Sequence, residues 1–247
     1  AKRYMHEFGA TREDLANVAV SARDWALLNP RAYTHNDGPL SVNDVLSARS
    51  IVDPLGKLDC CLVTDGAAAV VMTRADRAKD TKNTPIYLLG AAMEHHHRMV
   101  SEMPDLVRTS AIDSGKRAFA MSGYSPKDMN TIQLYDAFTI NTLLFLEDLG
   151  FCNKGEAIDL VKNNNIGPLG NLPVNTNGGG LSCVHPGMYG LFVTIEAIRQ
   201  LRNSSGDNVG DRLNGGWIPN AKLSIAHGNG GVLSSQVTNI WGVSETI

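Results

Sequence analysis

Apolar and polar positions follow one another along the chain in a pattern that predicts helices and strands in turn. Residues 10–28 predict a helix with small apolar side chains on one face. Thr11, followed three positions later by Asp14, is typical of a helix start in which the two residues cap each other. Three further helices are predicted over residues 108–121, 139–149 and 188–201.

Strands are predicted between these helices. The stretch over residues 58–73 ends in continuous apolar and β-branched residues, as a strand buried on both faces would. The other predicted strands cover residues 85–93, 130–136, 222–226 and 232–242. Strands that alternate with helices predict an α/β fold with a layered, mixed sheet. The polar stretch over residues 76–84 marks the predicted boundary between two parts of the chain.

Composition narrows the possible classes of protein. The 247 residues suffice for one large domain or two small ones, and 43% hydrophobic with 19% charged residues is ordinary for a globular protein. A net charge of -3 gives no electrostatic reason to expect nucleic acid or an anionic membrane as partner. The four cysteines form no C-x-x-C pair, so neither a disulfide framework nor a zinc site is predicted, and a reducing cytoplasm is the expected location.

Two glycine-rich stretches carry the candidate chemistry. The first, N-T-N-G-G-G-L-S-C-V-H-P-G-M-Y-G over residues 175–190, places His185 just before a predicted helix. The second, A-H-G-N-G-G over residues 226–231, places His227 on a predicted loop after a strand. Because glycine has no side chain, such loops let the backbone come close to a ligand. The two stretches therefore predict two imidazoles in one pocket.

Taken in order, the motifs resemble the C-terminal part of the thiolase superfamily. The resemblance is greatest to the sterol-carrier or lipid-transfer type of thiolase, which includes the thiolase subunit of benzoylsuccinyl-CoA thiolase. D-G-A-A-A at residues 65–69 resembles the last strand of the family's N-terminal half. Y-D-A-F at residues 135–138 stands where the family carries N-E-A-F or H-D-C-F. The stretch over residues 178–187 resembles the family's histidine loop, and H-G-N-G-G at residues 227–231 stands where many members carry C-x-G-x-G.

The resemblance implies an α/β fold of the thiolase type, layered as αβαβα, in which two similar halves each contribute a five-stranded mixed sheet. Residues 1–80 would be the end of the N-terminal half, and residues 81–247 the C-terminal half. The family's nucleophilic cysteine would lie before residue 1. The chain is therefore expected to lack most of the N-terminal half and to need it for complete activity.

The resemblance also assigns roles to individual side chains. His185 would polarise a thioester oxygen, and His227, in place of the family's second cysteine, would move the proton at the substrate α-carbon. Tyr135 would support a second oxyanion, and Asp136 would orient the loops. Cys183 could be a reactive thiol at the site or, as the alternative, a small buried hydrophobe. The residues expected to contact substrate are Phe8, Gly187, Gly228 and Cys183.

The implied activity is that of a thiolase-type acyl-CoA C-acyltransferase, which cleaves or forms a carbon–carbon bond α to a CoA thioester. Two alternatives remain open. One is a thiolase-like retro-aldolase that acts on a hydroxyacyl-CoA without an acyl-cysteine, with Tyr135 in the proton transfer. The other is a non-catalytic thiolase-like scaffold subunit. Coenzyme A is expected as substrate, with no bound cofactor or metal. Further copies of the chain and a small OB-fold protein with a zinc ribbon are the expected partners.

Overall fold

The computed structural model describes all residues, 1–247. Its centre is a four-stranded mixed sheet with the strand order β3-β6-β5-β4. β6 is antiparallel to both of its neighbours, whereas β4 and β5 are parallel. The resemblance implied five strands, and a single parallel bridge from Ile132 to Val174 stands beside β4 outside the four-stranded sheet. The strands are β3 (Tyr87–His95), β4 (Thr131–Leu134), β5 (Leu223–Gly230) and β6 (Ser235–Gly242), with a separate small hairpin of β1 (Ser50–Val52) and β2 (Leu55–Gly56).

Helices cover the sheet and extend beyond its edge. The α-helices are α1 (Lys2–Phe8), α2 (Arg12–Leu27), α3 (Val42–Ser47), α4 (Ala75–Ala78), α5 (Ala111–Ser122), α6 (Thr139–Asp148), α7 (Ala157–Val161) and α8 (Gly190–Ser204). Short 3₁₀ helices occupy Lys57–Asp59, Val100–Glu102, Pro126–Asp128, Lys162–Asn164 and Ser244–Thr246, and a π-helical turn occupies Gly179–Cys183. None of these helices combines the length and apolar composition that crossing a membrane requires.

Helix α2 begins where the sequence predicts it. The Thr11 side chain accepts the backbone N–H of Asp14, and the Asp14 carboxylate accepts the backbone N–H of Thr11 at 2.8 Å. Each residue thereby satisfies an N–H group that would otherwise lack a partner at the helix start. Helix α5 ends at Gly123, which adopts the left-handed conformation with φ 76°.

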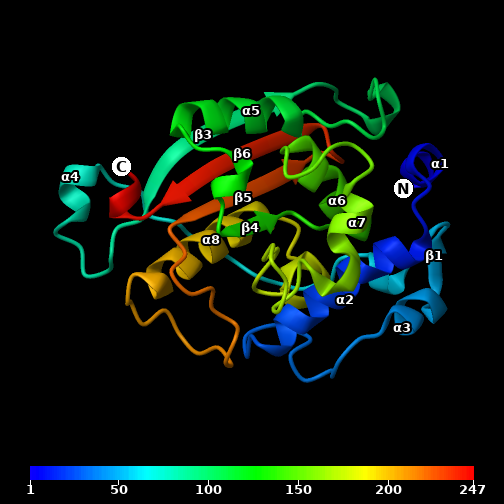
Figure 1. Ribbon diagram of the computed structural model, residues 1–247, viewed down its shortest axis with the longest axis horizontal. Coiled ribbons are helices and arrows are strands. Elements are labelled where there is room, and N and C mark those ends of the chain that lie inside the picture. The colour runs from blue at the N-terminus through cyan, green and yellow to red at the C-terminus, as the bar shows by residue number, and fades with distance from the viewer.

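The alternation of side chains along the strands, whose order β3-β6-β5-β4 can be followed in Figure 1, sorts residues between two faces of the sheet. Ile132 and Leu134 of β4 lie in the main core of 27 buried residues, which α5 and α6 share. Tyr135, just after β4, packs instead with the smaller cluster that contains Val193 of α8. This two-sided arrangement confirms the predicted α/β layered class. It also directs the end of β4 toward the start of α8.

Close packing of α5 on the sheet depends on one glycine. A Cβ atom at Gly90 of β3 would lie 2.1 Å from the carbonyl oxygen of Ala118. No other residue fits at this position without moving the helix, because 2.1 Å is far below van der Waals contact.

The predicted buried strand within residues 58–73 is wrong. Residues 61–74 form no regular element, and Val63 and Val71 are 98% and 94% exposed. A strand needs neighbours for its N–H and C=O groups, and no other strand lies beside this segment. The segment is attached instead by the N–H groups of Cys61 and Leu62, which donate to the carbonyl oxygens of Ala137 and Gly180. The predicted division of the chain at residue 80 stays a prediction.

The predicted loop around His227 is also wrong. β5 continues through His227 to Gly230, so the glycine-rich stretch is half of a hairpin. β6 provides the reason, because it pairs His227 with Thr238 and Gly230 with Ser235. Glycines weaken a strand, but a continuous antiparallel partner supplies the hydrogen bonds that maintain it.

Candidate active site

Tyr135 and His185, both predicted site residues, come together at the carboxyl end of β4. The N–H group of Tyr135 continues the strand pairing by donating to the carbonyl oxygen of His227 at 2.9 Å. The Tyr135 and His185 rings meet edge-to-face, with centroids 5.3 Å apart and an interplanar angle of 84°. Both side chains are half-buried, so each retains a side that a ligand can reach.

The His185 imidazole has a free nitrogen. Its Nε2 atom is buried and has no hydrogen-bond partner in the protein. The backbone holds the residue in place, because the His185 N–H group donates to the Thr64 hydroxyl at 2.9 Å. Burial lowers the pKa of His185 below its usual value, so the ring is neutral near pH 7. A neutral imidazole with an unpartnered nitrogen can accept or donate a proton.

Asp136 is fully buried and holds the loop that leads to His185. Its carboxylate accepts the N–H groups of Gly180 at 2.6 Å and Leu181 at 3.3 Å. Burial raises the pKa of Asp136 to about 7, although these two N–H donors act in the opposite direction. Gly179, at φ 67°, is required here, since a Cβ atom would lie 2.1 Å from the Asp136 Oδ2 atom. This geometry fits the predicted role of Asp136 in orienting a loop.

Tyr189 is a site residue that sequence reasoning missed. It is fully buried, and its ring lies 5.4 Å from that of Tyr135 and 5.9 Å from that of His185. Its hydroxyl donates to the Asn177 side-chain oxygen at 3.3 Å, and the same oxygen accepts the N–H of Gly179 at 2.8 Å. Its position four residues after His185, at a helix start, was a signal in the sequence that could have identified Tyr189. No such signal marked Thr64, whose hydroxyl binds the His185 N–H group, because its segment has the composition of a buried strand.

His227 does not join this pair. It is fully buried on the α6 side of the sheet, with its ring 4.6 Å from that of Phe145. Both ring nitrogens have partners, Nδ1 with the Thr238 hydroxyl at 2.9 Å and Nε2 with the Gln236 side-chain oxygen at 2.9 Å. His227 lies on this face because β5 extends through it, and strand geometry fixes which face each side chain occupies. In this position His227 offers no free nitrogen for the α-proton transfer that the resemblance implies.

The buried position of His227 predicts a loss of stability in mild acid. Burial lowers the pKa of His227 to about 4, against ~6.5 in an unfolded chain. The unfolded state therefore takes up a proton that the folded state does not, and stability falls as the pH drops from about 6.5 toward 4. Between pH 7 and pH 5 we expect His227 to contribute a loss of about 2 kcal/mol to the free energy of unfolding, while Asp136, whose pKa is raised, takes up a proton in the folded state and acts in the opposite direction. Urea titration of the wild type and of His227→Gln isolates the His227 contribution as the difference between their pH dependences, whereas His96→Gln, at an exposed site, should follow the wild type.

The four predicted substrate contacts are dispersed. Phe8 packs on Tyr4 with ring centroids 4.9 Å apart, and it fills the space above Gly155, away from His185. The Cys183 thiol is buried and accepts the Asn29 side-chain N–H at 3.6 Å, while burial raises its pKa to about 12. This environment fits the alternative role of a buried hydrophobe.

The two predicted glycine contacts do lie beside the pair. The carbonyl oxygen of Gly187 accepts the Tyr135 hydroxyl at 3.5 Å. Gly228 faces the first residue of α8, because a Cβ atom on it would lie 3.5 Å from the Gly190 Cα atom. A Cβ atom on Gly187, by contrast, would have no neighbour within 4 Å.

Known proteins give this geometry a context. Residues 92–243 match the family described as thiolase C-terminal domain-like. The chain is 42% identical over 212 residues to 17-hydroxy-3-oxo-4-pregnene-20-carboxyl-CoA lyase of Mycobacterium tuberculosis, covering 83% of this chain and 54% of that protein. It is 40% identical over 221 residues to the steroid side-chain-cleaving aldolase of Thermomonospora curvata, covering 87% of this chain and 55% of that protein.

The benzoylsuccinyl-CoA thiolase subunit BbsB of Thauera aromatica, at 35% identity over 82% of this chain and 53% of its own length, confirms the predicted resemblance. Among solved structures, an Ltp2-ChsH2(DUF35) aldolase superposes with a TM-score of 0.85 and 31% identity over 100% of this chain and 62% of that chain. The chain thus spans little more than half the length of the curated relatives named here. The matched domain, the relatives and the superposition agree that the chain belongs to the thiolase superfamily, with the fold of that superfamily's C-terminal domain.

Proposed function

We propose that this chain is part of a thiolase-like retro-aldolase that breaks the Cα–Cβ bond of a β-hydroxyacyl-CoA. Two relatives, one of them 42% identical, are named as a CoA-ester lyase and a side-chain-cleaving aldolase. The main prediction from the sequence, thiolase-type acyl transfer, has less support than this alternative. Membership of an enzyme family and the free His185 nitrogen both count against a non-catalytic scaffold.

The pairing of Tyr135 with His185 supports this proposal. The Tyr135 phenol lies beside a neutral imidazole with an unpartnered nitrogen. Cys183 is buried, and Cys61, the other thiol of this region, has its pKa raised to about 11 by burial and by Asp136. Only a thiolate is an effective nucleophile, so these thiols are unsuited to form an acyl-cysteine at neutral pH. An acid–base pair suffices for a retro-aldol reaction.

The protonation states suggest how the pair divides the work. As a neutral base, His185 would take the proton from the β-hydroxyl group. The Cα–Cβ bond then breaks, and the β-carbon leaves as a ketone or aldehyde. The electron pair of the broken bond stays on the α-carbon side and forms the thioester enolate. Burial raises the pKa of Tyr135, which keeps the phenol protonated and able to supply a proton to the α-carbon. Proton transfer from His185 back to Tyr135 resets the site.

His185→Gln tests the assignment of the base. In the full-length enzyme we expect kcat to fall roughly 10²–10⁴-fold, because glutamine hydrogen-bonds but cannot take a proton. The pKa of His185 is lowered, so the acid limb of the wild-type kcat/KM profile should lie below pH 6.5 and vanish in the variant. If the variant kept the acid limb of the kcat/KM profile, the titrating group would be one other than His185. An oxyanion role alone would let glutamine preserve most of kcat.

The absence of an acyl-cysteine can be tested directly. The full-length protein is mixed with a short acyl-CoA donor, denatured and weighed by mass spectrometry. We expect an unchanged mass together with full cleavage of a β-hydroxyacyl-CoA. A mass increase equal to one acyl group, located on a cysteine, would restore the thiolase interpretation.

The comparison with solved structures suggests a partner protein for the enzyme. An Ltp2-ChsH2(DUF35) aldolase is one solved structure whose fold matches this chain over its whole length. We therefore propose that the enzyme acts on a CoA ester within an assembly that contains a small OB-fold zinc-ribbon protein and more than one copy of this chain. Co-purification with such a protein, and its effect on cleavage rate, would check this proposal.

A further inference from the structure

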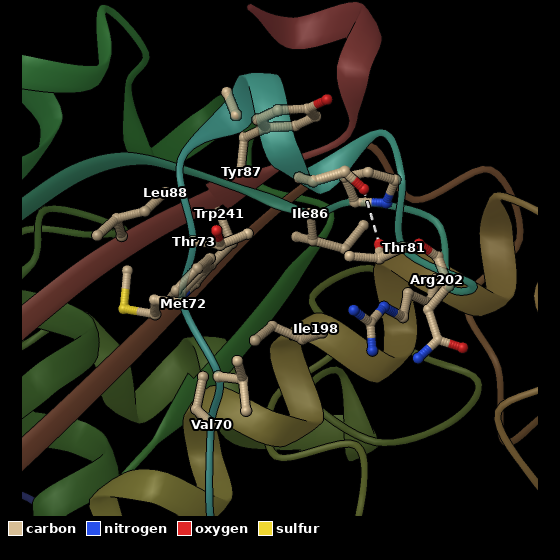
Figure 2. Close-up of a pocket in the computed structure, with 15 residues that line it drawn as sticks. Val70, Met72, Thr73, Thr81, Ile86, Tyr87, Leu88, Ile198, Arg202 and Trp241 are labelled. Atoms are coloured by element: carbon tan, nitrogen blue, oxygen red, sulfur yellow. Dashed lines mark hydrogen bonds between the residues drawn. The ribbon is translucent and has the colours of Figure 1, made fainter.

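A cavity lies between α8 and strands β3 and β6 of the sheet, outside the Tyr135–His185 pair. It has a volume of about 400 Å³ and opens between the exposed segment at residues 70–73 and the connection from α4 to β3 (Figure 2). Its walls are mostly apolar and come from segments far apart in the sequence. They include Val70, Ile86 of the connection, Ile198 of α8 and Trp241 of β6. This volume falls within the range of small-molecule sites.

One charged group in the wall of this cavity, Arg202, has unused hydrogen-bonding capacity. Arg202 donates from Nε to the carbonyl oxygen of Thr84 at 3.1 Å, and its guanidinium forms no ion pair with a carboxylate. The nearest acid along the chain, Asp207, is engaged by the Thr84 N–H at 2.8 Å and hydroxyl at 2.6 Å.

We propose that this cavity binds an amphipathic monocarboxylate. The hydrocarbon part would fill the space between Val70, Ile86 and Ile198, and the carboxylate would pair with the free guanidinium nitrogens of Arg202. A planar guanidinium matches a carboxylate in geometry as well as in charge. The proposal is independent of the retro-aldolase assignment, since Tyr135 and His185 do not line this cavity.

Calorimetric titration of the full-length protein with octanoate and with 1-octanol tests the proposal. The two probes share a chain length and differ in charge. We expect saturable binding of octanoate at least tenfold tighter than that of 1-octanol. Hexanoate should bind about fifteenfold more weakly than octanoate. It has two fewer methylene groups, and each one that leaves water strengthens binding roughly fourfold. Equal binding of the charged and neutral probes would overturn the proposal.

Variants locate the binding. Arg202→Gln should remove the preference for octanoate over 1-octanol. Ile198→Trp should abolish binding by filling the cavity, with the fold checked by circular dichroism. Arg117→Gln, at an exposed arginine already paired with Glu94 at 2.6 Å, is the matched control and should bind as the wild type does. Octanoate binding that Ile198→Trp leaves unchanged, or no saturable binding in any variant, would show that the cavity is not the site or is filled by protein.

Discussion

Tyr135→Phe is expected to lower kcat for β-hydroxyacyl-CoA cleavage by roughly 10²–10⁴-fold, the usual contribution of a positioned acid or base. The variant loses only the phenolic hydroxyl, so the edge-to-face contact with His185 remains. Without that hydroxyl, the proposed proton donor to the α-carbon is lost, and the enolate reverts or waits for solvent. Steady-state kinetics of the full-length enzyme would measure the effect, with KM expected to change much less than kcat.

Tyr189→Phe is the matched control for this substitution. It also removes one hydroxyl from the aromatic cluster, but that hydroxyl is buried and donates to Asn177 rather than to the space beside His185. We expect its kcat to stay within about tenfold of wild type, since one neutral hydrogen bond contributes roughly 0.5–1.5 kcal/mol. If Tyr135→Phe kept more than half of the wild-type kcat, Tyr135 would not be the acid.

Arg212→Met is expected to lower the free energy of unfolding by about 3–5 kcal/mol. The Arg212 side chain is completely buried and forms an ion pair with Glu196 at 2.5 Å. Its guanidinium also donates to the carbonyl oxygen of Thr176 at 2.6 Å and stacks 4.4 Å from the Trp217 ring. Removing the cation leaves the Glu196 charge buried without a counter-ion. The loss is large against the ~5–15 kcal/mol that stabilises a typical domain. Chemical denaturation at pH 7 would measure it.

Two comparisons separate the buried charge from lost packing. Adding Glu196→Leu to Arg212→Met should recover part of the lost stability, because the unpaired carboxylate is then gone. Arg117→Met breaks an exposed pair with Glu94 and should cost no more than about 1 kcal/mol. Equal losses from the exposed and the buried pair would contradict this explanation.

The sequence predicts most of the helices because their signals are local. The reciprocal cap of Thr11 and Asp14 and the left-handed Gly123 depend on neighbouring residues only. The strand predicted within residues 58–73 is wrong for the opposite reason. Their apolar, β-branched composition is typical of a buried strand, but a strand forms only where other strands bind it, and pairing is a property of the whole fold. β5 shows the converse, since its partner β6 extends the strand through a glycine-rich stretch.

The candidate site was predictable in its parts and not in its assembly. Tyr135, Asp136 and His185 each follow from a motif, and the structure brings the three together. His227 also lies in a motif, but the strand around it turns its ring to the opposite face. Tyr189 and Asn177 link the π-helical turn to α8 through a hydrogen bond over a sequence distance of twelve residues. Spacing alone does not reveal such a contact, because it depends on the turn that Asp136 holds.

The most direct test compares two substrates on one sample of the full-length enzyme. A β-hydroxyacyl-CoA is supplied without free coenzyme A, and the matching β-ketoacyl-CoA is supplied with it. The account predicts that the β-hydroxyacyl-CoA is split into a carbonyl compound and a shorter acyl-CoA at a rate independent of added coenzyme A, and that the β-ketoacyl-CoA is left intact. Thiolysis of the β-ketoacyl-CoA, with no cleavage of the β-hydroxyacyl-CoA, would contradict it.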